Sequence, residues 1–117
     1  MRTFEIEEPV FKTSTLFVVG CDFETFRKRL KTRYRTEVGE YVGQIGQMFT
    51  FKEPPFRIVW AKTLDAPVIL HEVFHLVTRI CDDRGIPIKA HFDHESGDEA
   101  AAFLFESFAR IVLKKIR

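Results

Sequence analysis

The segment HEVFH holds two histidines, His71 and His75, on either side of a glutamate. Residues four apart lie on the same face of an α-helix, so both imidazoles can bind one metal ion. Glu72 would lie beside them, close enough to accept a proton from a metal-bound water without binding the metal itself. The segment therefore predicts a Zn2+ site in which His71 and His75 are ligands and Glu72 is a general base.

The residues around this motif predict a helix from residue 65 to residue 84. Asp65 is suited to the N-cap and Pro67 to the first turn, where a missing amide costs little. Arg84 and Gly85, followed by a proline, give the stop signal. A pair of solvated surface histidines is the alternative, but the neighbouring residues are uncharged and mostly bulky. The apolar residues predict a stripe that packs against a core: Val68, Ile69, Val73, Phe74, Val77, Ile80 and Cys81.

The stretch VILHEVFHLV resembles the extended signature of the zincin metallopeptidases, with uncharged residues around HExxH and no internal proline. The metzincin branch is excluded, because Thr78 holds the place of its glycine and Arg84 or Gly85 that of its third histidine. The resemblance therefore implies that the third ligand comes from a following helix, as in gluzincins. The size of the chain also resembles that of small zincin-like proteins from bacteriophages.

Glu99 is the preferred third ligand. The arrangement Glu99, Ala102 and Phe105 is similar to the second-helix pattern of the compact ImmA/IrrE-like metallopeptidases, and the small alanines would let two helices approach closely. The alternative is structural, because Ser96 and Glu99 also form a capping box. The other candidates for the third ligand are Glu106, Asp98, Glu95, His91 and His94.

The chain departs from the gluzincin pattern at Phe103. Many gluzincins place an aspartate four residues after the ligand glutamate, where it orients a histidine. In this chain that partner must come from elsewhere, and Asp98 and a backbone carbonyl are candidates. A donor to the oxyanion is also needed. His91 and His94 lie between the two predicted helices, and His94 is preferred as a catalytic residue because it is nearer to Glu99.

Length and composition indicate one globular domain over residues 1–117, with 45% hydrophobic residues and 13 phenylalanines. The formal net charge of +1 argues against a polyanionic partner. A polar, acidic N-terminus and the lack of a long apolar run predict no signal peptide and no membrane span, hence a cytoplasmic location. Cys21 and Cys81 are expected to be buried thiols rather than a disulfide or a metal pair.

The order of predicted elements indicates an α+β fold with a small sheet of about three strands, the motif helix and a C-terminal helix. This order resembles that of a minimal zincin. The last predicted strand would be the sheet edge that binds an extended peptide or protein substrate. Asp22 is the expected cap of the first helix. Strands are predicted at 15–20, 47–52 and 56–62, and further helices at 22–33 and 98–115.

A basic run at residues 27–35 is the one competing signal, since clustered cations can bind nucleic-acid phosphates. On a helix whose apolar residues face inward, such charges form the solvated face, so no nucleic-acid partner is expected. The sequence thus predicts a zinc-dependent metallopeptidase that hydrolyses a peptide bond. The alternative is a non-catalytic, zinc-stabilised interaction or regulatory domain.

Overall fold

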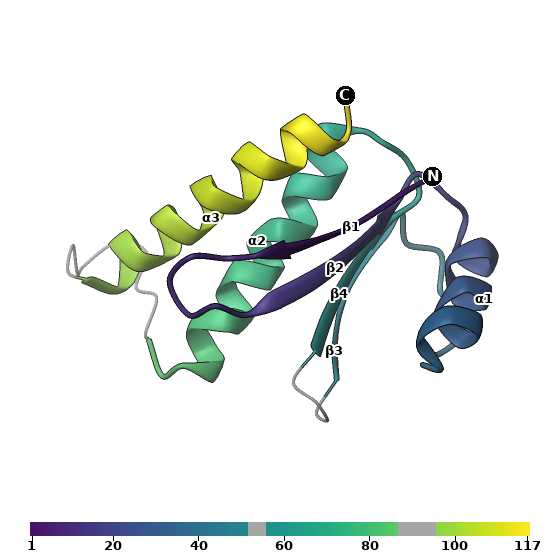
Figure 1. Cartoon of the computed structure of the whole chain (residues 1–117), viewed down its shortest axis with the longest axis horizontal. Helices are drawn as coiled ribbons and strands as arrows, with labels where there is room; N and C mark the ends of the chain where they lie inside the picture. The colour runs from purple at the N-terminus through teal and green to yellow at the C-terminus, as the bar shows by residue number, and fades with distance from the viewer. Residues whose placement is uncertain (52–55, 87–95) are drawn as a thin grey trace.

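A computed structural model describes residues 1–51, 56–86 and 96–117, which form the α+β fold expected from the sequence (Figure 1). Within these residues there are four strands and three helices. The strands are β1 (Arg2–Glu7), β2 (Ser14–Val19), β3 (Gly46–Phe51) and β4 (Phe56–Ala61). The helices are α1 (Phe23–Tyr34), α2 (Ala66–Asp83) and α3 (Ser96–Lys115).

The strands form one mixed sheet in the order β1-β2-β4-β3. β2 and β4 pair in parallel, and the other two pairs are antiparallel. Helices α2 and α3 cover one face of the sheet and α1 covers the other (Figure 1). The central strand β2 is therefore buried on both faces, which explains its continuous apolar run.

β1 is an additional strand that the sequence analysis did not predict. Its residues alternate, with Phe4 and Ile6 turned to the core and the acidic Glu5 and Glu7 exposed. Phe4 stacks on Phe17 of β2, with 5.1 Å between the ring centroids. The sequence analysis interpreted this segment as a polar terminus because of its acidic residues. Alternation of apolar and acidic residues is nevertheless typical of a strand with one buried face.

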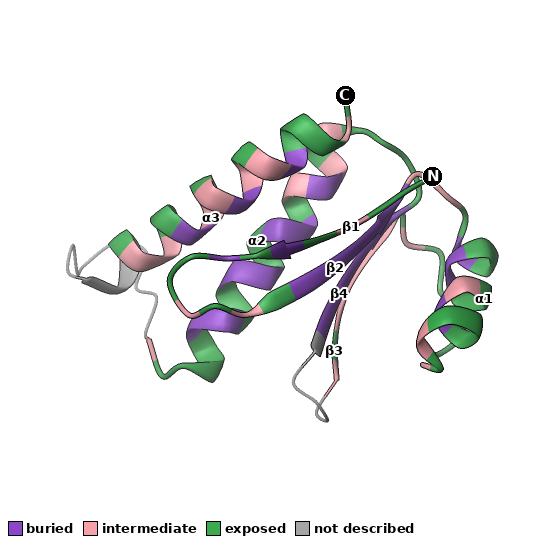
Figure 2. Cartoon of the chain, viewed as in Figure 1, coloured by how far each residue is buried: buried purple, intermediate pink, exposed green. Residues whose placement is uncertain are grey.

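Helix α1 agrees with its prediction. The Asp22 carboxylate accepts a hydrogen bond of 2.8 Å from the Thr25 amide and so caps the helix. Phe23, Phe26 and Leu30 are buried against the sheet, while the basic side chains lie on the outer face (Figure 2). This arrangement is the solvated basic face that the sequence predicted.

Helix α2 has nearly the predicted bounds, and most of its apolar stripe is buried, but two side chains differ. Phe74 was expected in the core and is 62% exposed, so this part of the prediction is wrong. Each helical residue turns by about 100°, which carries Phe74 past the buried stripe onto the face of His71 and Thr78. Asp65 occupies the N-cap position but makes no capping hydrogen bond through its side chain.

Helix α3 runs antiparallel to α2 and packs on it through Leu104, Phe108 and Val112, all fully buried (Figures 1 and 2). None of the described helices is long and apolar enough to cross a membrane. The two cysteines are free thiols, with Cys81 buried and Cys21 half-buried.

The turn between β1 and β2 is built around the buried carboxylate of Glu8. It accepts hydrogen bonds from the amides of Val10, Phe11 and Thr13 and from the Thr13 hydroxyl, at 2.7–3.0 Å. Burial raises the pKa of Glu8, but these hydrogen bonds outweigh it and hold the pKa below its usual value. The ionised form of Glu8 therefore stabilises the fold.

Glu8→Gln is expected to lower the free energy of unfolding at neutral pH by about 1–3 kcal/mol, because an amide cannot accept all of these bonds. The folded-state pKa is lowered, so the stabilisation is complete above the unfolded pKa and is lost as pH falls through the folded value. Urea unfolding at several pH values measures this, with Glu7→Gln on the exposed face of β1 as control. If Glu8→Gln lowers the free energy of unfolding equally at pH 7 and pH 3, the ionised carboxylate of Glu8 is not the source of the stabilisation.

Candidate metal centre

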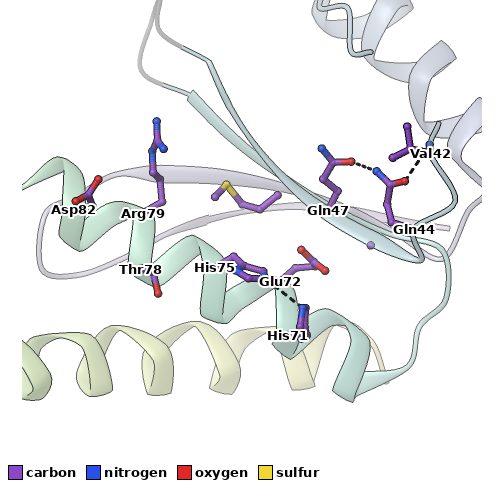
Figure 3. Close-up of a pocket in the computed structure, with 11 residues that line it drawn as sticks. Val42, Gln44, Gln47, His71, Glu72, His75, Thr78, Arg79 and Asp82 are labelled. Carbon is purple, nitrogen blue, oxygen red and sulfur yellow. Dashed lines mark hydrogen bonds between the residues drawn. The ribbon is translucent and has the colours of Figure 1, made fainter. Parts of the chain in front are cut away.

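His71 and His75 lie one turn apart on the same face of α2, as the motif predicted (Figure 3). Both side chains are exposed, which the bulky, uncharged neighbours in the sequence did not lead us to expect. Their Nε2 atoms are 3.2 Å apart, a distance that also allows a hydrogen bond between the rings. Two nitrogens bound to a tetrahedral zinc at about 2.0–2.1 Å would lie roughly 3.3 Å from each other. The histidine pair is therefore already spaced as two ligands of one zinc ion.

Glu72 is only 6% exposed and lies under the start of strand β3. Burial raises its pKa, and the neighbouring His71 and His75 act in the opposite direction without cancelling that effect. A carboxylate of this kind is a stronger base than one in free solution. Its place beside two imidazoles fits the role of a proton acceptor.

Gly46 makes room for Glu72. A Cβ atom on Gly46 would lie 3.1 Å from both Cγ and Oε2 of Glu72 and 3.3 Å from the Trp60 carbonyl oxygen. The φ angle of Gly46 is not positive, so the glycine is needed for close approach rather than for an unusual backbone conformation. The sequence analysis missed this residue, although a glycine at the start of a strand can signal such an approach.

A pocket of about 640 Å³ lies between α2 and β3, and His71, Glu72 and His75 all line it (Figure 3). A neighbouring hollow of about 520 Å³ shares His71 and Glu72 with it. The motif thus lies where a ligand has access. The remaining residues of the larger pocket are Val42, Gln44, Gly46, Gln47, Met48, Thr78, Arg79 and Asp82, none of which the sequence analysis had assigned to the site.

The strand beside this pocket is β3, not β4. The predicted substrate-binding edge was residues 56–62, but β4 lies between β2 and β3 and pairs with both. That prediction is wrong, because the parallel pairing of β2 with β4 places β4 inside the sheet. β3 lies at the edge and supplies Gly46, Gln47 and Met48 to the pocket.

No candidate for the third ligand lies beside the histidine pair among the described residues. Among the described residues, no three histidine, cysteine, aspartate or glutamate side chains form a group that could hold a metal ion. Glu99 is exposed in the first turn of α3. Because the helices are antiparallel, that turn lies toward the end of α2, whereas His75 lies roughly 12 Å before this end. The assignment of Glu99 stays a prediction.

Glu106 is an exposed alternative on the same helix. It lies ten residues after the start of α3, a rise of roughly 15 Å, which brings it closer to the level of His75. Its carboxylate forms an ion pair with Arg110. An exposed pair of this kind is weak, so Glu106 could exchange this partner for a metal ion.

The other candidates fall in the part of the chain that the structure does not describe. His91, His94 and Glu95 lie outside the described residues, and so do the side chains of Ser96 and Asp98. The predicted catalytic role of His94 and the capping box therefore stay predictions.

Compared with known proteins, the chain matches no family model, no curated protein and no solved structure at a significant level. The resemblance to zincins rests on the motif helix and, more loosely, on α3.

Gly46→Ala is expected to lower the free energy of unfolding by about 1–3 kcal/mol, because the new methyl group must displace Glu72 or the edge strand. Gly39→Ala is the matched control, since a Cβ at Gly39 meets nothing within 4 Å. Chemical unfolding of both variants measures the difference. Equal stabilities of the two variants would show that β3 and Glu72 are not in close contact.

Proposed function

We propose that this protein is a zinc-dependent metallopeptidase with Glu72 as its general base. The observation that carries the proposal is the 3.2 Å spacing of the His71 and His75 Nε2 atoms, beside a buried glutamate that opens on the same pocket. A purely structural zinc site needs no base at that position. The choice of a peptide bond as the bond that is hydrolysed is supported only by the resemblance of the motif to that of zincins.

In the proposed reaction His71 and His75 would hold zinc through Nε2, and a carboxylate from α3 would be the third ligand. The bound zinc would make water more acidic and polarise the carbonyl of the substrate. Glu72 takes one proton from the water whose oxygen forms a bond to the carbonyl carbon. When the C–N bond breaks, Glu72 returns this proton to the leaving amine nitrogen.

The edge strand β3 supports an extended peptide or protein as the substrate. A peptide that pairs with β3 would run along the pocket, past Gly46 and Glu72. Its backbone would then pass beside the histidine pair. β3 thus takes the role that the sequence analysis had given to β4.

We also propose that the protein works in the cytoplasm without a nucleic-acid partner. Free thiols at Cys21 and Cys81 suit a reducing compartment. Helix α1, which carries the basic face, lies across the sheet from α2, the helix of the histidine pair (Figure 1). Acidic residues flank its cations in the sequence. The acidic residues of this region are Asp22, Glu24, Glu37 and Glu40.

A zinc-stabilised interaction domain is the second candidate. Phe74 on α2 and Phe103 on α3 are 62% and 51% exposed, and exposed aromatic side chains are common at protein interfaces. In such a domain zinc would hold α2 and α3 together, with four protein ligands and no position for water.

Ligand binding at zinc separates these candidates. A catalytic zinc keeps one position open, so hydroxamates should bind to the zinc-loaded protein and raise its melting temperature. At a hydroxamate concentration of 100 times Kd, the stabilisation should be about 2.7 kcal/mol. The metal-free protein is the control and should not respond. No response from the zinc-loaded protein, with four protein ligands on zinc, would favour the interaction domain.

A further inference from the structure

The end of the pocket beyond the histidine pair contains a cation that the proposed reaction does not use. Arg79 lies one helical turn after His75 and two turns after Glu72, so the three side chains share one face of α2. All three line the pocket. Figure 3 shows the Arg79 side chain extending from α2 toward the strands, away from α3. Its guanidinium group therefore faces the space between α2 and β3.

The β3 residues that face this space lie on the same side of the sheet as Glu72. Met48 packs against the core beneath α2, whereas the next residue, Phe49, packs against the core beneath α1. Side chains of a strand alternate between the two faces, so Gly46 and Met48 both face α2. Glu72, Met48 and Arg79 thus line one space on one face of the sheet.

Two ion pairs to one carboxylate hold Arg79 in place. Nη2 of Arg57 lies 2.6 Å from Oδ2 of Asp83, and Nε of Arg79 lies 3.4 Å from Oδ1 of the same residue. The Arg57 side chain is only 7% exposed, so Asp83 is fixed from inside the protein. Arg79 uses Nε in its ion pair, and no other partner of its guanidinium group lies among the described residues. Its two terminal nitrogens can therefore donate to a ligand.

The charges at this end of the pocket favour an anionic ligand. One carboxylate shared by two arginines leaves one positive charge in excess. Asp82 also lines the pocket and carries the opposite charge, but no described residue holds its carboxylate in place, whereas Asp83 holds Arg79. A group that is already held in place loses less conformational entropy on binding. The planar guanidinium group can also form two parallel hydrogen bonds to a carboxylate.

We propose that Arg79 is a specificity-determining residue that binds an acidic side chain of the peptide substrate. This role rests on the proposed function. The axial rise from His75 to Arg79 is about 6 Å, and one residue of an extended peptide spans about 3.3 Å. The acidic residue of the substrate is thus two or three residues from the bond to be cleaved.

Peptide hydroxamates that differ in one charge test this role. Each probe joins the zinc-binding group to three alanines, with glutamate, glutamine or lysine in place of the second or third alanine. The hydroxamate follows the peptide in one series and precedes it in the other, so that both directions of binding are covered. Calorimetry on the zinc-loaded protein gives the Kd values, with acetohydroxamate as the probe that carries the zinc-binding group alone.

The glutamate probe should bind to the wild type about 3–5-fold more tightly than the glutamine probe in one of the two series. This is the effect of a surface ion pair, because the Arg79 side chain is 50% exposed. Arg79→Gln should abolish this preference and leave the Kd of acetohydroxamate unchanged. Asp82→Asn should increase the preference, because it removes a negative charge from the same pocket. Arg27→Gln is the matched control, since Arg27 is an exposed arginine in an ion pair on α1.

The results distinguish this inference from the proposed function. If the wild type binds acetohydroxamate but shows no preference for the glutamate probe in either series, the role of Arg79 is wrong and the proposed function stands. The same conclusion follows if Arg79→Gln keeps the preference, or if the lysine probe binds more tightly than the glutamate probe. If the zinc-loaded wild type binds none of the hydroxamates, the proposed function fails and the role of Arg79 fails with it.

Discussion

Glu72→Gln is expected to abolish hydrolysis while zinc stays bound. Glutamine keeps the shape of the side chain but cannot accept the proton of water, so turnover should fall by at least about 10²–10⁴-fold. The zinc affinity should match that of the wild type, because Glu72 lies beside the two imidazoles and is not one of the proposed ligands. Peptide-library cleavage would first identify a substrate, and its turnover and the bound zinc would then be measured in both proteins.

The stability of the same variant is an internal control. Burial raises the pKa of Glu72, so the charged form is disfavoured in the folded protein. A neutral glutamine should therefore leave the free energy of unfolding unchanged or slightly higher. Loss of zinc from Glu72→Gln would contradict the role of a free base and would make Glu72 a ligand.

His71→Ala and His75→Ala are each expected to weaken zinc binding by at least about 100-fold, because each removes one of only two nitrogen ligands. Both histidines are exposed, so the metal-free variants should unfold within about 0.5 kcal/mol of the wild type. Competition with a chromogenic chelator measures the affinity, and urea unfolding measures the stability. Wild-type affinity in either variant would show that the pair does not hold the metal.

The glutamates of α3 provide a matched pair of variants for the third ligand. Glu99 and Glu106 are both exposed, so neither Glu99→Ala nor Glu106→Ala should disturb the fold. We expect Glu99→Ala to weaken zinc binding markedly. If Glu99→Ala binds zinc like the wild type and Glu106→Ala does not, Glu106 is the ligand.

Sequence patterns that span only a few residues predicted the helices well, but they did not predict the order of the strands in the sheet. Asp22 and the spacing of Phe23, Phe26 and Leu30 identify α1 because capping and helical periodicity act within a few residues. The position of β4 could not be predicted in the same way. It depends on a parallel pairing between β2 and β4, which are separated by a helix and a strand and leave no local pattern.

The same limit applies to the candidate site. His71 and His75 were predicted because their spacing on one helix brings them together without help from the rest of the fold. Gly46 and Met48 come from a strand some 25 residues earlier and reach the site only through the packing of β3 on α2. The third ligand depends on how α3 lies against α2, which is set by the buried contacts of side chains such as Phe108.

The zinc content of the protein purified without a histidine tag tests the central claim most directly. After incubation with zinc and removal of the excess, elemental analysis should give about one zinc ion per chain. The same treatment of His71→Ala should give almost none. Less than about a tenth of an equivalent in the wild type would contradict the metal centre, and with it the proposed peptidase activity.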